Sequence, residues 1–192
     1  GRLKEIQVGV PGGKTSPALD AQPVPDHVDW DRWVGPAPMT AFNAEKLKRD
    51  NHENITNFSL GMISCWGIHH LDIAQWGNGT DSTGPVSVEG TATYPQSGSC
   101  DAVLSWKVRM EYANAAPITF ANESKEAGQI GHGTRFIGED GWVHVVRGNI
   151  WASNEAILKD PQNKYDTMPV KLPVSNEHTR NFVDAVKTGG RA

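Results

Sequence analysis

Two stretches of strict alternation between apolar and polar residues constrain the fold of this chain more than any other feature. In residues 85–94, PVSVEGTATY, and in residues 103–112, VLSWKVRMEY, every second side chain is apolar or small. Successive side chains of a β-strand point to opposite faces, so a period of two indicates a strand. Both stretches therefore predict antiparallel strands with one buried face and one polar face.

Further strands are predicted on either side of this pair. Residues 3–10, LKEIQVGV, alternate in the same way, and residues 117–123 form another short apolar run. Residues 134–148, TRFIGEDGWVHVVRG, contain Asp140-Gly141 between two apolar runs, which is a hairpin signal. The predicted fold class is α+β: an open, mainly antiparallel sheet of about six strands with helices packed on one face.

Periodicity predicts the helices, and prolines predict the connecting arm. Residues 61–76 predict one helix of about four turns, ended by the glycines at 77 and 79. Residues 41–50 predict a short helix, and residues 175–190 a late helix capped by Ser175 or Asn176, with Phe182 and Val186 as its apolar stripe. Prolines between residues 11 and 38 predict an ordered arm without regular structure.

Composition excludes some classes of function. The chain has 192 residues, a formal net charge of −4 at pH 7 and no basic run, so nothing indicates a nucleic-acid-binding protein. No apolar run approaches the roughly 20 residues of a membrane-spanning helix. The two cysteines are too few for a disulfide scaffold, and localisation in the cytoplasm or after export stays open.

The predicted helix at residues 61–76 carries the candidate chemistry. At 3.6 residues per turn, Cys65, His69, Asp72 and Trp76 fall on one stripe, whereas His70 points about 100° away from His69. His69 could act as a general acid or base, or could be a buried histidine satisfied by its neighbours. A metal site built from both histidines and Asp72 is a third, weaker alternative because the two imidazoles diverge.

No dinucleotide-binding motif is present. The chain lacks a G-x-G-x-x-G sequence after a strand, and GVPGGKTS at residues 9–16 lacks the first glycine of a phosphate-binding loop. Any redox activity must therefore use a cofactor site supplied by another domain.

The order of motifs resembles the C-terminal domain of the Gfo/Idh/MocA (glucose–fructose oxidoreductase / inositol dehydrogenase) family, in the branch common in environmental bacteria. GRLKEIQVGV is similar to the strand that leaves that family's Rossmann domain, and PVPDHVDWDRWVGPAP to its Pro/Trp-rich arm. GMISCWGIHHLDIAQWGNGTDSTGPVSVEG resembles its active-site helix and the following strand. FIGEDGWVHVVRG and SNEHTRNFVDAV resemble its hairpin and its late helix.

The resemblance implies a function and a set of site residues. In that family a helix with the pattern D-x-x-x-H-x-x-D places an acid/base histidine beside the nicotinamide. Carried over to this chain, the histidine is His69 and the last aspartate is Asp72, whereas Cys65 replaces the first aspartate. A thiol cannot orient or charge an imidazole as a carboxylate does, so the usual proton relay is altered.

From these observations we expect one substrate-binding and oligomerisation domain, residues 1–192, with residues 11–40 as its arm. It would belong to an NAD- or NADP-dependent oxidoreductase that acts on a sugar or polyol. The N-terminal Rossmann domain would be absent from this chain, so we expect the chain alone to bind no cofactor and to be inactive. Candidate catalytic residues are His69 and Asp72; candidate substrate contacts are Trp66, His70, Trp76 and Arg180. We also expect a homo-oligomer formed through the polar sheet face. The alternative is a stand-alone, non-catalytic module that binds glycan or assembles.

Overall fold

A computed structural model describes residues 1–122, 131–159 and 176–190. The chain divides into two compact units, Gly1–Asn154 and Glu155–Ala192. The first unit contains the sheet and its core. The described part of the second unit contains two helices, α5 (Glu155–Lys159) and α6 (His178–Thr188).

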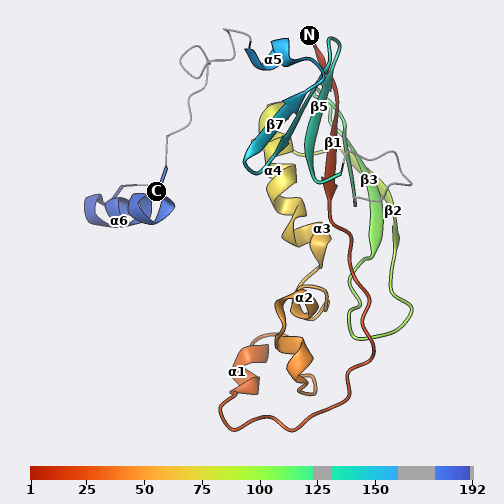
Figure 1. The fold of residues 1–192 in the computed structure, drawn as a ribbon, viewed down its shortest axis with the longest axis vertical. Coiled ribbons are helices and arrows are strands. Elements are labelled where there is room, and N and C mark those ends of the chain that lie inside the picture. Colours follow the sequence, from red (N-terminus) through yellow and green to blue (C-terminus); the bar gives the residue numbers. More distant parts are fainter. Residues whose placement is uncertain (123–130, 160–175, 191–192) are drawn as a thin grey trace. The chain divides into compact units, whose positions relative to one another are not determined.

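A seven-stranded open sheet organises the first unit (Figure 1). Its strands are β1 (Leu3–Val10), β2 (Ser87–Thr93), β3 (Ser105–Glu111), β4 (Ile118–Asn122), β5 (Gly133–Gly138), β6 (Trp142–Val146) and β7 (Asn149–Ala152). They lie in the order β2-β3-β4-β1-β5-β6-β7, and only the β1–β4 pair is parallel. The predicted α+β class and mainly antiparallel sheet are confirmed. The sheet has one strand more than expected because β7 extends the predicted hairpin.

The predicted alternation of buried and exposed residues is confirmed for β3, whereas the predicted burial of one face is wrong for β2. Along β3, Trp106 is buried whereas Lys107, Arg109 and Glu111 are exposed. All seven residues of β2 are exposed, even Val88, which remains 58% exposed. The reason is position: β2 forms the edge of the sheet, whereas the main helix packs on β1 and β5.

The predicted helix at residues 61–76 is two helices in the structure. They are α3 (Met62–Cys65) and α4 (Gly67–Asn78), with Trp66 between them. Trp66 keeps a near-helical backbone, φ −95° and ψ −28°, so the break changes the direction of side chains little. Helix α4 ends as predicted, at Gly79 in the left-handed conformation with φ 66°.

Three smaller predictions need correction. The arm contains a five-residue helix, α1 (Trp30–Val34), which starts because the Asp29 side chain accepts a hydrogen bond from the Arg32 amide. The short helix at residues 41–50 is a 3-10 turn, η1 (Ala44–Leu47), followed by α2 (Arg49–His52). The N-cap residue of α6 is Glu177 and not Ser175 or Asn176, and its side chain makes no capping hydrogen bond. The helix stops at Gly189 as expected.

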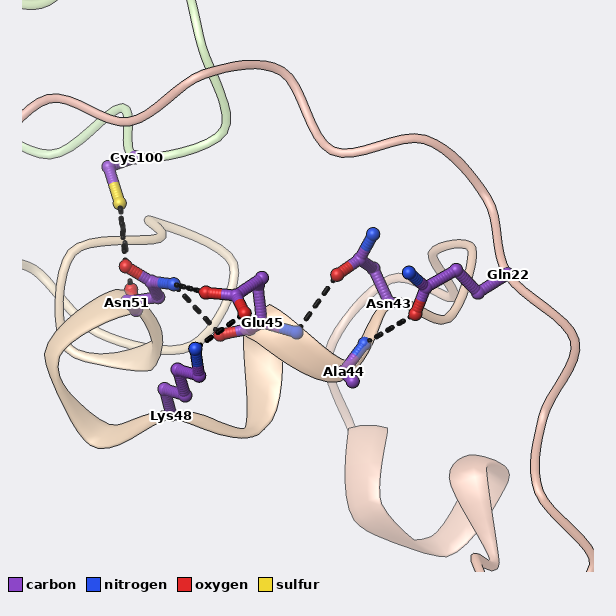
Figure 2. Close-up of polar contacts among 7 residues, drawn as sticks. All are labelled: Gln22, Asn43, Ala44, Glu45, Lys48, Asn51 and Cys100. Carbon is purple, nitrogen blue, oxygen red and sulfur yellow. Dashed lines mark hydrogen bonds and ion pairs between the residues drawn. The ribbon is translucent and has the colours of Figure 1, made fainter.

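Polar contacts around η1 tie the arm to the body of the first unit (Figure 2). The Ala44 amide donates to Gln22 Oε1 at 3.0 Å, and the side-chain amide of Asn51 donates to the Glu45 carbonyl at 2.9 Å. The thiol of Cys100 lies 3.9 Å from Asn51 Oδ1. The cluster therefore joins the arm and the β2–β3 connection to the consecutive elements η1 and α2.

Aromatic packing fixes the arm at a second place. Trp30 is buried and stacks on Trp33 with ring centroids 4.7 Å apart, and its indole N–H donates to the Thr40 carbonyl at 2.8 Å. Phe42 and Phe58 complete this cluster. Trp30 and Trp33 thus hold the arm in place.

The main core lies between α4 and one face of the sheet. Its buried apolar side chains are Ile6, Val8, Val10, Ala74, Val103, Trp106, Ile118 and Phe120. Two glycines of α4 allow the close approach: a Cβ at Gly67 would lie 2.9 Å from the ring of Phe120, and one at Gly77 would lie 2.1 Å from the ring of Phe136. A larger residue at either position would push the helix away from the sheet.

Gly77→Ala tests this close approach. The added methyl group overlaps Phe136, and overpacking costs about 1–3 kcal/mol, more than the gain of up to about 1 kcal/mol in helix propensity. We expect a lower free energy of unfolding in urea titrations. The matched control is Gly84→Ala, where nothing lies within 4 Å of the new Cβ. Equal stability of the two variants would contradict the proposed packing.

Candidate functional site

Helix α4 has two chemically different faces. Its outer face carries Ile68, His69, Asp72 and Trp76, all exposed, and we call these four residues the exposed stripe. Ile68 is 67% exposed and Trp76 is 54% exposed. The predicted site residues His69, Asp72 and Trp76 therefore lie together on an accessible surface.

His69 keeps its imidazole available within this stripe. Its ring lies edge-on to the half-buried ring of Trp66, with centroids 5.8 Å apart. Among the described residues, no hydrogen bond joins His69 to Asp72 or to Cys65; the Cys65 sulfur instead lies 3.4 Å from Ser59 Oγ. The thiol of Cys65, which stands at the position of the family's first aspartate, therefore contacts Ser59 and not His69.

His70 faces the sheet and is completely buried, with 0% of its surface exposed. Its Nε2 lies 2.9 Å from Nε2 of His132, and one of these two nitrogens must carry the shared proton. Its carbonyl oxygen accepts a hydrogen bond from Thr134 Oγ1 at 3.0 Å. This burial argues against direct contact between His70 and a substrate, so the function proposed below does not use it.

Burial changes the acid–base behaviour of His70. Loss of solvent around its imidazole, together with charge repulsion from the nearby His132, Arg147, His69 and His144, lowers the pKa of His70 to about 4. His70 is therefore neutral at pH 7. A neutral buried imidazole suits a structural link between α4 and the segment before β5.

Acid should weaken the folded state through His70. Its pKa in the folded chain lies below the ordinary value of 6.5, so the unfolded chain takes up the proton first. Stability is complete above about pH 6.5 and falls as the pH approaches about 4, by about 3 kcal/mol at most. Urea unfolding at several pH values measures this loss.

His70→Gln isolates the histidine contribution to this pH dependence. The variant loses the His132 contact and is less stable at neutral pH, but its stability should fall less steeply between about pH 6.5 and about pH 4. His27→Gln, which changes an exposed histidine of the arm, should keep the wild-type slope. An unchanged slope in His70→Gln would contradict the assignment.

Arg180 lies in α6, within the second unit, and its guanidinium pairs with Asp184 at 2.9 Å. Its role as a site-lining residue stays a prediction. Within residues 1–122, 131–159 and 176–190, no group of three or more His, Cys, Asp or Glu side chains could hold a metal ion. Because His69 is exposed and His70 is buried against the sheet, the arrangement does not favour a metal-dependent hydrolase.

Sequence reasoning missed a second set of residues, on the face of the sheet opposite α4. Arg135, Trp142, His144 and Trp151, with His132 and Val146, line a hollow of about 490 Å³ over β5, β6 and β7. The period of two in TRFIGEDGWVHVVRG could have predicted part of this set. In a hairpin with this turn, Arg135 pairs with His144, so their side chains lie on one face of the sheet. The spacing gave no indication of His132, which lies before β5.

Comparison with known proteins agrees with the geometry of α4 and the sheet. The family model described as the Gfo/Idh/MocA oxidoreductase family, C-terminal alpha/beta domain, matches residues 12–191. This chain belongs to that family. No curated protein matches it. Among the described helices of this Gfo/Idh/MocA domain, none is long and apolar enough to cross a membrane.

Family membership implies a nicotinamide cofactor, and the exposed stripe suits its neighbourhood. The chain offers an imidazole, a carboxylate and apolar side chains on one accessible surface, but no glycine-rich loop to hold a pyrophosphate. These residues fit the wall that faces a nicotinamide and a substrate. They do not fit a complete dinucleotide site.

Proposed function

We propose that this chain is the substrate-binding and oligomerisation domain of an NAD- or NADP-dependent oxidoreductase that acts on a sugar or polyol. The exposed stripe on α4 is the single observation that carries the proposal. It places His69 and Asp72 at the surface, on a helix whose opposite face is locked to the sheet. An N-terminal Rossmann domain of the same protein would cover this surface and hold the nucleotide.

His69 is the proposed acid–base residue. A bound nicotinamide would supply the hydride acceptor for the carbon that carries the substrate hydroxyl. His69 takes the hydroxyl proton as this carbon becomes a carbonyl carbon, and returns a proton in the reverse direction. Asp72, one turn away on the same stripe, binds a second hydroxyl or orients the imidazole. Cys65 takes no part because its sulfur contacts Ser59.

The aromatic and apolar side chains around His69 are proposed to shape the substrate site. Trp76 presents more than half of its surface and offers a flat face for a sugar ring. Trp66 is half-buried, edge-on to His69, with the Arg147 guanidinium 5.3 Å from its ring centroid. It therefore supports the imidazole more directly than it contacts a substrate. Ile68 would exclude water once the partner domain closes.

The polar part of the open sheet face is proposed as the surface for homo-oligomer contacts. Arg109 there pairs with Glu111 at 2.7 Å and with Glu5 at 3.4 Å, and Thr119 Oγ1 donates to Glu5 at 3.0 Å. This network joins β1, β3 and β4 on the face of the sheet opposite α4. Such an ordered polar surface can pair with a second copy without large rearrangement.

The catalytic role of His69 is tested in the intact protein encoded by the native gene. His69→Gln keeps a polar side chain of similar size but cannot act as an acid or base near neutral pH. We expect kcat to fall about 10²–10⁴-fold with little change in KM for a sugar or polyol. Steady-state kinetics with NAD and NADP over a panel of sugars and polyols measures both constants.

His27→Gln is the matched control for these kinetics, since it removes an exposed histidine outside α4. It should leave both constants unchanged. A full-length protein without any nucleotide-binding half, or a His69→Gln variant with wild-type kcat, would rule out the proposed role. The first outcome would favour a stand-alone module that binds glycan or assembles.

A further inference from the structure

The open face of the sheet carries a second candidate site, on the side of the sheet opposite α4 and its exposed stripe. The hollow lined by Arg135, Trp142, His144 and Trp151 lies over β5, β6 and β7. Thr134 and Phe136 of β5 point to the opposite face, where they contact α4. The sheet therefore separates this hollow from the proposed acid–base residue.

Arg135 supplies a positive charge that no carboxylate of residues 1–122, 131–159 and 176–190 neutralises in an ion pair. Its guanidinium lies 4.6 Å from the ring centroid of Trp142, and no described carboxylate pairs with it. Its Nε is buried without a hydrogen-bond partner, and burial lowers the pKa of the guanidinium. A guanidinium held on an aromatic face with an unused Nε donor is suited to bind a carboxylate, whose two oxygens match the guanidinium fork.

His144 supplies a hydrogen-bond acceptor at the base of the hollow. It is 95% buried, since only 5% of its surface is exposed, and Nε2 lies 3.0 Å from the His132 carbonyl oxygen. A carbonyl only accepts, so Nε2 must carry the proton. Burial lowers the pKa of His144, which keeps the imidazole neutral. Nδ1 is therefore an acceptor, and it has no partner in the described structure.

Two tryptophans enclose these polar groups. Trp151 is 49% exposed, and its ring lies edge-on to His144 with centroids 5.6 Å apart. Trp142 lies under the guanidinium on the next strand. Flat rings on two sides suit a ligand with a ring or a carbon chain whose C–H groups pack on aromatic faces.

We propose that this hollow binds a small hydroxylated carboxylate, with the carboxylate on Arg135, a hydroxyl donating toward His144 and the carbon skeleton between Trp142 and Trp151. Sugar acids have this chemistry. A volume of about 490 Å³ lies within the range of small-molecule sites and accommodates one such molecule. The site is separate from the redox site proposed above and does not depend on it.

Binding of glucuronate to the full 192-residue chain tests the proposal. The indole N–H signals of Trp142 and Trp151, assigned with Trp→Phe variants, should shift in NMR titrations with glucuronate. Glucose, its neutral counterpart, should bind at least about tenfold more weakly because it lacks the charge that Arg135 recognises. Acetate should also bind more weakly because it has neither hydroxyls nor a skeleton to pack on the rings.

Two arginine variants give a matched comparison. Arg135→Gln should weaken glucuronate binding about tenfold or more. Arg109→Gln removes another arginine of the same sheet face, already paired with Glu5 and Glu111, and should leave binding unchanged. His69→Gln should also leave it unchanged, which separates this site from the proposed redox site.

Three results would overturn the proposal. One is the absence of any shift in the two indole signals at saturating glucuronate. Another is glucose binding as tightly as glucuronate. The third is a dimer that Arg135→Gln dissociates in sedimentation experiments while glucuronate binds nowhere, since the carboxylate on Arg135 would then come from a second copy of the chain.

Discussion

The contact between α4 and the sheet is the constraint on which the rest of the first unit depends. Glycines at positions 67 and 77 allow the helix backbone to lie so close to Phe120 and Phe136 that a single added methyl group would overlap their rings. Ala74 and His70 fill the space between them without exposed surface. Since both ends of the helix are seated on aromatic rings, its rotation about its own axis is defined, and so is the face that it presents outward.

This defined rotation explains how one short segment can carry two histidines with different properties. His70 points inward, where its Nε2 contacts His132, its carbonyl oxygen accepts a hydrogen bond from Thr134, and burial keeps it neutral, while its Nδ1 has no partner among the described residues. Its neighbour His69 points outward on the exposed stripe. The first histidine stabilises the helix position, and the second is available for chemistry. Buried polar groups of this kind specify a unique arrangement when their hydrogen bonds are made.

The fold could be predicted from the sequence where a local period decided it. Alternation located β3, the Asp140-Gly141 turn signal located the hairpin, and the glycines after residue 76 located the end of α4. Helical spacing placed His69 and Asp72 on one face. Prediction failed where tertiary position decided the outcome. Val88 repeats the pattern of a buried strand yet lies at an uncovered edge, and His132 reaches His70 across 62 residues of sequence. No local pattern carries that information.

Carboethoxylation of individual histidines by diethyl pyrocarbonate, followed by peptide mass spectrometry of the intact native protein, tests the central claim most directly. Without nucleotide, His69 should react at a rate within a few-fold of exposed His27, and His70 should stay unmodified. Saturation with nucleotide and a sugar or polyol substrate should slow the labelling of His69 alone. Labelling of His70 as fast as His69, or labelling of His69 that ignores both ligands, would contradict the account.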